Sequence, residues 1–409
     1  MFAASLFVAL AVAHAGEPRS ADAAGLIDAV DSVPIPVADY AAPSQRGFAM
    51  QVCGSFGPNV QRDRACHQNL ITEVRTMPRR CLFFAGFTLA AGLAMHAAPA
   101  SAQEVNLRYA HVGSEGDIQY WYAEQAAERI EEGTDGRVAV NVFPNSQLGG
   151  VQETIDGVRS GSISMAHHEF ASLAQLVEDI AVFNAPFVYR DGAHALAATD
   201  PSSSEVLQEF NEKLIGDGDM RIIGRLFRGA RQMTANQEVL SPADLEGKPF
   251  RGVPLQLWTT MIDGFGAIPT PVEVSELPTA LMTGMVIGQE NPLTMINANK
   301  LYEVQSHVML TGHMQNVLPV FVNETAWQEI GEDDRAAILE MLDDLAQETL
   351  AIAQEDEEKL ITELEGKGMT FVSTEDGLQL DAFKESVTAQ VNQDFPTWKP
   401  YMDRIAAVE

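Results

Sequence analysis

Residues 105–166 read VNLRYAHVGSEGDIQYWYAEQAAERIEEGTDGRVAVNVFPNSQLGGVQETIDGVRSGSISMA, and this stretch decides the fold class. Alternating or short apolar runs predict strands, and apolar residues at helical spacing predict the helices between them. We expect strands over Val105–Val112, Arg137–Phe143 and Ser162–Ala166, and helices over Gln119–Glu132 and Val151–Ser160. Strands that alternate with helices in this way pair in parallel, with helices on both faces of the sheet. The sequence therefore predicts an α/β protein.

Further along the chain, one segment differs from the others in length. Residues 332–365 have helical spacing and contain neither proline nor glycine. This segment is well above the usual helix length of about 11–12 residues, and it lacks the regular heptads of a coiled coil. A helix of this size spans about 50 Å, long enough to lie across two domains. Before it, we expect strands over Arg221–Phe227, Lys248–Val253 and Val286–Gln289, and a helix over Leu255–Phe265.

An export signal lies inside the chain rather than at its start. Residues 77–102 read MPRRCLFFAGFTLAAGLAMHAAPASA: a basic start, an apolar middle and a small-residue ending, which is the layout of a secretory signal peptide. We expect cleavage after Ala102. Residues 1–76 show no sustained helical or strand periodicity, and residues 17–60 have a composition that buries little, so the segment 1–76 is either an over-long gene model upstream of Met77 or a disordered leader. Both alternatives give the same mature chain, residues 103–409.

The charge of the chain restricts its partners. The seven basic and seven acidic residues of 1–102 cancel, so the net charge of −31 belongs to the mature part. Such an acidic surface repels nucleic acid and anionic lipid, so we expect neither as a partner. All three cysteines precede the predicted cleavage site, which excludes disulfides and thiol chemistry in the mature chain. An anionic ligand would have to meet placed cations inside a cleft, and each buried arginine is a candidate.

Several motifs, in order and in spacing, carry a family resemblance. They are PNSQLGG (144–150), GARQMTAN (229–236), DLEGKPFRGVP (244–254), GAIPTPVEVSELPTAL (266–281), GQENP (288–292) and KLYEVQ (300–305). With them the chain resembles the DctP-type solute receptors of tripartite ATP-independent periplasmic (TRAP) transporters, over Val105–Asp403. The resemblance implies a two-lobed periplasmic-binding-protein (Venus-flytrap) fold of the α/β class, with one long helix spanning both lobes. The implied lobes are 104–228 plus 317–356 (lobe I) and 229–316 plus 357–409 (lobe II).

The same resemblance implies a function. Such a receptor is periplasmic, captures a small organic acid between its lobes and passes it to the small and large subunits of a membrane permease. It uses no cofactor and is not an enzyme, and we expect a monomer. Two departures from the family pattern, Ile287 in place of an aspartate and Pro278 in place of an aromatic residue, leave the identity of the acid open. A dicarboxylate, a sugar acid, a keto acid and an aromatic acid all remain alternatives.

Three residues are expected to hold the ligand by analogy with the family. Arg251 matches the arginine that grips the ligand carboxylate, and its guanidinium offers two parallel donors that lysine cannot copy. The alternative is a surface arginine paired with one of the many acids. Arg231 matches a second arginine and follows a predicted strand end, where clefts of open α/β sheets form. Asn291 is held extended by the following Pro292, so its amide can donate to one ligand oxygen and accept from a hydroxyl.

Further candidates line the expected pocket. Glu169 matches a position that approaches the ligand in some members, with a structural acid as the alternative, and Trp258 is either a pocket wall or a core residue. The remaining candidates for the ligand site are His168, Phe187, Gln315 and Asn316. Because adjacent strand residues face opposite ways, His167 and His168 cannot easily bind one metal ion, and no metal site is expected.

Two other classes of protein are alternatives to the transporter receptor. A receptor of an ABC importer would share the flytrap fold, but GQENP and the single very long helix favour the TRAP family. An exported enzyme acting on an organic acid is the other alternative. The chain carries no G-x-S-x-G, H-E-x-x-H or P-loop motif, and its mature part has no cysteine nucleophile.

Overall fold

The computed structural model describes residues 105–409, so the predicted leader, signal peptide and cysteines lie outside the described residues. The chain starts with three strands and two helices: β1 (Val105–Ala110), α1 (Ile118–Gly133), β2 (Val138–Phe143), α2 (Val151–Arg159) and β3 (Met165–His167). Strand β1 pairs in parallel with both β2 and β3. The predicted α/β beginning of the chain is therefore confirmed.

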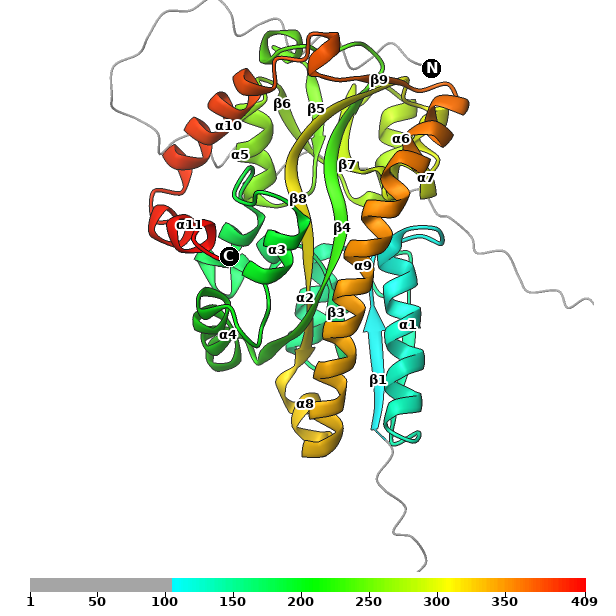
Figure 1. Ribbon diagram of the computed structural model, residues 1–409, viewed down its shortest axis with the longest axis vertical. Helices are drawn as coiled ribbons and strands as arrows, with labels where there is room; N and C mark the ends of the chain where they lie inside the picture. The colour runs from blue at the N-terminus through cyan, green and yellow to red at the C-terminus, as the bar shows by residue number, and fades with distance from the viewer. Residues whose placement is uncertain (1–104) are drawn as a thin grey trace, which may run out of the picture. The chain divides into compact units, whose positions relative to one another are not determined.

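Two long antiparallel strands form the middle of the sheet. They are β4 (Met220–Ala235) and β8 (His307–Asn323), and the strand order is β2-β1-β3-β8-β4-β7, with β9 (Thr370–Val372) also on β8. Strand β3 joins one end of β8, whereas β7 (Gly288–Pro292) joins the other half of β4. Figure 1 shows the two long strands running side by side through the fold. They therefore connect the two groups of shorter strands.

Helices cover this sheet, and a small second sheet lies beside it. Strands β5 (Pro249–Gly252) and β6 (Ile268–Pro271) pair in parallel and form the second sheet. The remaining α-helices are α3 (Gly192–Ala198), α4 (Glu205–Gly218), α5 (Gln256–Gly264), α6 (Leu277–Met282), α7 (Leu293–Ala298), α8 (Glu324–Glu329), α10 (Leu380–Asp394) and α11 (Lys399–Ala406). Short 3-10 helices occupy Phe170–Gln175, Glu178–Asn184, Pro242–Leu245, Val274–Glu276, Leu301–Glu303 and Thr374–Asp376.

The long helix is present as predicted. Helix α9 runs over Glu332–Gly366 and packs along β4 (Figure 1). In its middle Glu348 pairs with Arg129 of α1 at 2.7 Å, and at its end Lys367 donates to Asn297 of α7 at 2.6 Å. It thus contacts elements on both sides of the fold. No helix in the described part of the chain combines the length and the apolarity that a membrane span needs.

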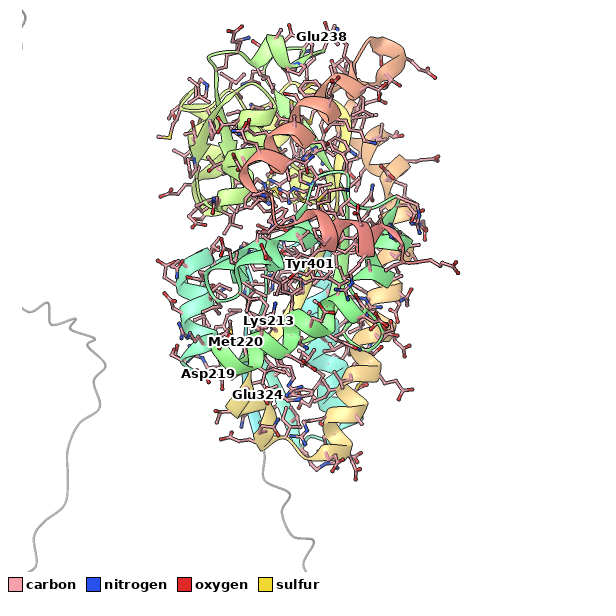
Figure 2. The ribbon with its side chains drawn as sticks, turned by 90° about the vertical axis from the view of Figure 1, so that its left-hand side faces the viewer. Lys213, Asp219, Met220, Glu238, Glu324 and Tyr401 are labelled. Atoms are coloured by element: carbon pink, nitrogen blue, oxygen red, sulfur yellow. The ribbon has the colours of Figure 1, made fainter. Side chains whose placement is uncertain are left out.

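The structure differs from the sequence prediction in both long strands. Strand β4 does not end at Phe227 but continues to Ala235 through a register irregularity at Gly229, whose φ is +96°. Strand β8 was not predicted from the sequence. Helix α11, which carries Tyr401 (Figure 2), packs against α4, and the ring centroids of Tyr401 and Phe210 are 4.9 Å apart.

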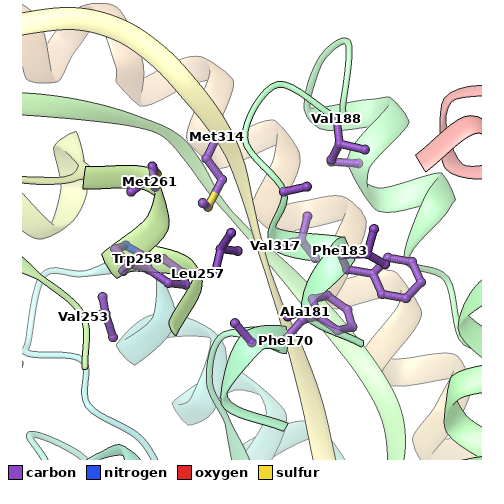
Figure 3. Packing of buried hydrophobic residues seen from close by; sticks show 14 of the residues in the cluster. Phe170, Ala181, Phe183, Val188, Val253, Leu257, Trp258, Met261, Met314 and Val317 are labelled. Atoms are coloured by element: carbon purple, nitrogen blue, oxygen red, sulfur yellow. The ribbon is translucent and has the colours of Figure 1, made fainter. Parts of the chain in front are cut away.

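Buried side chains form three clusters. One surrounds β1, α1 and α9 and includes Leu107, and a second surrounds α6 and α7 and includes Ile296. The largest cluster includes both Phe170, which follows β3, and Trp258 of α5, so it continues from one part of the fold to the other (Figure 3). Apolar burial of this extent is the main favourable contribution to folding.

Candidate ligand-binding site

A cavity lies where residues before β4 in the chain, two arginines of β4 and residues after β4 come together. The centre of a water molecule can occupy about 40 Å³ of this cavity. It is lined by Val112, Gln119, Val151, His168, Glu169, Arg228, Arg231, Arg251, Val253, Glu273, Val274, Asn291, Met295 and Leu318. Five of the predicted site residues are among them: Arg251, Arg231, Asn291, Glu169 and His168. The three arginines give a cavity in an acidic protein a positive lining.

Arg251 presents free hydrogen-bond donors to this cavity. It lies in β5 and is 2% exposed, and its Nε donates to the carbonyl oxygen of Val272 at 2.8 Å. Within the described residues, its two terminal nitrogens have no hydrogen-bond acceptor and no ion-pair partner. Burial lowers the pKa of Arg251 to about 10, so the group stays charged at neutral pH. A buried, charged guanidinium with two adjacent free nitrogens suits a carboxylate.

Arg231, in contrast, is saturated by the protein. It lies inside β4 rather than after a strand end, which corrects the sequence prediction. Its Nε and Nη2 both bond the carboxylate of Glu290, and Nη2 also reaches Asn291 Oδ1 at 3.0 Å. Its Nη1 donates to Glu169 Oε1 at 3.1 Å and to Asn316 Oδ1 at 3.2 Å. All its donors therefore already have acceptors, and Arg231 holds the surrounding side chains in place.

Glu290 is the acid at the centre of this network, and sequence reasoning did not select it. It is fully buried on β7, and it also accepts from Trp258 Nε1 at 2.7 Å and contacts His313 Nε2 at 3.1 Å. Burial opposes its ionisation, but the charges and hydrogen bonds of Arg231 and His313 together outweigh burial and lower the pKa of Glu290 to about 2. The sequence did contain a signal for this acid: Glu290 stands directly before Asn291 in GQENP, and an acid buried with Asn291 would need a cation as its partner.

Glu169 and Asn291 contact the same network from opposite sides. Glu169 follows β3 and accepts from Asn184 at 2.9 Å and from Asn316 at 2.9 Å. Its burial raises its pKa, and Arg231 opposes that effect. On β7, Asn291 donates to Gln289 Oε1 at 2.6 Å. Asn316 itself is fully buried and does not line the cavity, so it serves as a support.

A third arginine, Arg228, was missed by the sequence analysis. It is 5% exposed, and its Nη2 donates to Asp117 Oδ2 at 3.1 Å while its Nη1 donates to Asn316 Oδ1 at 3.2 Å. The strand irregularity next to Gly229 turns this side chain toward the cavity, as bulges near functional sites often do. Asp117 is the N-cap of α1, so Arg228 ties that helix to β4. In the sequence, Gly229 directly after Arg228 was the signal that could have indicated this irregularity.

His168 faces the cavity as a neutral ring. Its Nδ1 accepts from the backbone N–H of Glu169 at 2.8 Å, which places the ring proton on Nε2. Burial, reinforced by Arg228, lowers the pKa of His168 to about 3. The adjacent His167 points elsewhere, with Nδ1 accepting from Tyr109 at 2.7 Å. Among the described residues, no group of three or more His, Cys, Asp or Glu side chains is placed to hold a metal ion.

Three predicted residues lie away from this cavity. Trp258 is fully buried in the core, with the guanidinium carbon of Arg231 5.4 Å from its ring centroid. Phe187 is half-buried, and its amide donates to the His313 carbonyl at 2.9 Å. Gln315 lines a different cavity, next to α9. The structure therefore places these side chains behind or beside the cavity, with Trp258 supporting it through Glu290.

The chemistry of this cavity suits an anion. The cavity combines one free guanidinium, a neutral histidine N–H and an asparagine amide, all largely removed from water. Over residues 109–395 the chain matches the model of the family called bacterial extracellular solute-binding protein, family 7 (DctP). The chain belongs to this family.

Relatives of this DctP-family protein are known from several bacteria. A solute-binding protein of Roseobacter denitrificans is 32% identical, and the match covers 76% of this chain and 94% of the relative. The 2,3-diketo-L-gulonate-binding periplasmic protein of Escherichia coli is 28% identical, with 75% and 91% covered. The C4-dicarboxylate-binding periplasmic protein of Rhodobacter capsulatus is also 28% identical, with 66% and 81% covered.

Solved structures of TRAP periplasmic solute-binding proteins share the fold. One from Roseobacter denitrificans, with bound L-galactonate, has a TM-score of 0.68 and 29% identity, covering 75% of this chain and 99% of the other. One from Sulfurospirillum deleyianum, with bound succinate, has a TM-score of 0.67 and 26% identity, covering 75% and 100%. The predicted two-lobed α/β fold and the predicted TRAP receptor family are thereby confirmed.

Proposed function

We propose that this DctP-family protein captures a small organic acid between its two lobes, with the ligand carboxylate on Arg251. The observation that carries the proposal is the buried guanidinium whose terminal nitrogens have no acceptor within the described residues. Arg231 and Arg228 are positively charged neighbours, but every nitrogen of Arg231 and both terminal nitrogens of Arg228 already donate to the protein, to Glu290, Glu169, Asp117 and Asn316 among others. Arg228 Nε also has no partner among the described residues, but that nitrogen is itself buried, so Arg251 is the cation whose two terminal nitrogens are both left for a ligand.

The environment of Arg251 favours a two-pronged contact. A planar guanidinium and a carboxylate match in geometry, and charge-assisted hydrogen bonds are about twice as strong as neutral ones. Because the cavity excludes most water, the attraction is screened less than at the surface. His168 Nε2 and the free N–H of Asn291 are further donors on the lining, so a second ligand oxygen can be bound beside the first.

The relatives support an acid as the ligand. The neighbouring structures contain L-galactonate and succinate, and a further one, 26% identical, contains D-erythronate. All three molecules carry a carboxylate.

The setting we propose is that of a TRAP receptor. DctP-family proteins are periplasmic, and we propose that this chain is exported and cleaved after Ala102, works as a monomer and delivers the acid to the small and large permease subunits. We place lobe I at 104–228 plus 317–356 and lobe II at 229–316 plus 357–409. N-terminal sequencing of the native protein tests the cleavage site; a mature chain that retains residues 17–76 would contradict it.

We propose binding without turnover. Calorimetry of the exported protein against short organic acids should give one-to-one binding for at least one of them. Mass spectrometry of the recovered ligand should show it unchanged. Conversion beyond one equivalent would make the protein an enzyme, and no binding to any acid would contradict the proposed function.

A further inference from the structure

A carboxylate also lines the acid-binding cavity. Glu273 lies between β6 and the 3-10 turn at Val274–Glu276, and it is half-buried. It lines the same cavity as Arg251. An acidic side chain on the wall of a pocket for acids needs a reason, because an unpaired like charge would weaken binding of any ligand placed against it.

The position of this carboxylate is fixed by a helix end. It lies against the start of α2, beside Gly150, the residue that caps this helix. The approach depends on Gly150, since a Cβ there would lie only 3.0 Å from Glu273 Oε1. Helix N-termini stabilise negative charge, so α2 holds the group in place as an anion. Glu273, which follows β4 in the chain, therefore lies against Gly150, which precedes β4.

Glu273 and Arg251 are near each other without forming a pair. Each affects the pKa of the other through its charge, yet no ion pair within 4.0 Å joins them among the described residues. Burial raises the pKa of Glu273, while the Val151 N–H and then the charge of Arg251 oppose that effect. The cavity thus offers a ligand both a cation with free donors and a hydrogen-bond acceptor.

We propose that Glu273 determines the ligand class: it selects acids with one carboxylate and at least one hydroxyl group, and it rejects acids with a second carboxylate. The inference rests on the proposed function. The ligand carboxylate binds Arg251, and a hydroxyl of the ligand donates to Glu273, which can only accept. Family membership does not decide this point, because relatives have been found with D-erythronate, which has one carboxylate, and with succinate, which has two.

Matched ligand pairs test the proposal. Meso-tartrate is D-erythronate with its terminal hydroxymethyl group replaced by a carboxylate, and galactarate is related to L-galactonate in the same way. Calorimetry at neutral pH would compare these four acids, with pantoate and succinate, on the wild-type protein. The same titrations on Glu273→Gln and Glu276→Gln show whether an effect comes from the position of Glu273 or only from the loss of one negative charge. Glu276 is the control because it is exposed, lies three residues away and does not line the cavity.

We expect a hydroxylated monocarboxylate to bind the wild type best, and at least tenfold more tightly than its partner with two carboxylates. Glu273→Gln keeps a hydrogen-bond acceptor but removes the negative charge, so the ratio within a pair should fall at least fivefold. Glu276→Gln should leave the ratio unchanged. Folding of each variant is checked by circular dichroism.

Three results would overturn the inference. Equal or tighter binding of an acid with two carboxylates to the wild type would show that Glu273 does not select against them, although the proposed function would stand. An unchanged ratio in Glu273→Gln, or an equal change in Glu276→Gln, would remove the selectivity from this residue. If none of the six acids binds, the proposed function fails and this inference fails with it.

Discussion

Arg231 and Glu290 form a two-pronged ion pair inside the protein, with Arg231 Nη2 2.8 Å from Glu290 Oε1 and Nε on the other carboxylate oxygen. The side chains are 1% and 0% exposed. Burial alone would disfavour both charges, but each stabilises the other, so the pKa of Arg231 is raised and that of Glu290 is lowered. The pair fixes the wall of the cavity and leaves the ligand to Arg251.

Breaking this pair should destabilise the fold. Glu290→Ala leaves the Arg231 guanidinium buried with only part of its charge compensated, because Glu169 remains at 3.1 Å. Removing one partner of a buried ion pair costs about 3–5 kcal/mol. We expect a loss of that size in the free energy of unfolding, measured by urea denaturation at neutral pH.

An exposed ion pair provides the control. Lys399 and Asp403 on α11 lie 3.0 Å apart, with side chains that are mostly exposed. Asp403→Ala should therefore lower the free energy of unfolding by less than about 1 kcal/mol. A similar loss in Glu290→Ala and Asp403→Ala would show that the buried pair contributes no more than a surface contact.

The local pattern of the sequence predicted the regular elements but not the long strands. Helix α9 could be predicted because its helical spacing is uninterrupted over its whole length. Strand β8 was missed because both of its faces are largely buried, so no alternation marks it, and because it contains Pro319. Proline within a run usually argues against a strand. Gly229 likewise looked like the end of β4, although the strand passes it through an irregularity in pairing.

Part of the candidate site was equally beyond sequence reasoning. Arg251 could be named because it sits in a motif, and a carboxylate grip needs its particular chemistry. The partnership of Arg231 with Glu290 depends on the register of β4 against β7, in which Glu290 lies opposite Met233. Register is set by the fold as a whole and cannot be deduced from one strand. The sequence therefore could not show that Arg231 is saturated by the protein while Arg251 is free.

Buried histidines should make the protein sensitive to acid. Burial lowers the pKa of His111 to about 4, although Asp117 opposes this effect. Between pH 6.5 and 4 the unfolded chain binds a proton at this position that the folded protein does not bind, so stability falls as pH falls through this window. The difference from an ordinary value of 6.5 corresponds to about 3 kcal/mol when the titration is complete.

Urea denaturation at a series of pH values measures the effect of His111. The wild type should lose stability steadily from pH 6.5 toward pH 4. His111→Gln removes the titrating group, so the slope of unfolding free energy against pH should be smaller for the variant. An identical slope in both proteins would mean that His111 is protonated as easily in the folded state as in the unfolded state.

Two helical glycines should respond oppositely to alanine. At Gly264 of α5, a Cβ would lie 2.7 Å from the backbone Cα of Val387 in α10, which cannot move easily. We expect Gly264→Ala to cost about 1–3 kcal/mol by overpacking. At Gly216 in α4 a Cβ would meet nothing within 4 Å, so Gly216→Ala should stabilise by about 0.5–1 kcal/mol. Urea midpoints that shift in the same direction would contradict the packing of α5 against α10.

The proposed role of Arg251 makes a prediction for ligand affinity rather than for stability. Arg251→Ala removes two charge-assisted donors and leaves a ligand carboxylate without its partner in a closed cavity. Truncating one partner of such a buried pair costs about 2–5 kcal/mol, which is roughly 30- to 4,000-fold in affinity. Arg251→Lys should recover only part of the loss, because an ammonium keeps the charge but lacks the two-pronged geometry.

Calorimetry with the acid that binds the wild type most tightly measures this loss, and circular dichroism checks that each variant folds. Arg159→Ala is the matched control, since Arg159 is exposed in the last turn of α2 and does not line the cavity. It removes the same charge from the same acidic protein, so it should change affinity by less than about twofold, well under 1 kcal/mol. If Arg251→Ala stays folded and binds within about fivefold of the wild type, a loss under roughly 1 kcal/mol, Arg251 does not hold the carboxylate. A loss that is equally large in Arg159→Ala would instead attribute the effect to the overall charge of the protein and not to the geometry of Arg251 in the cavity.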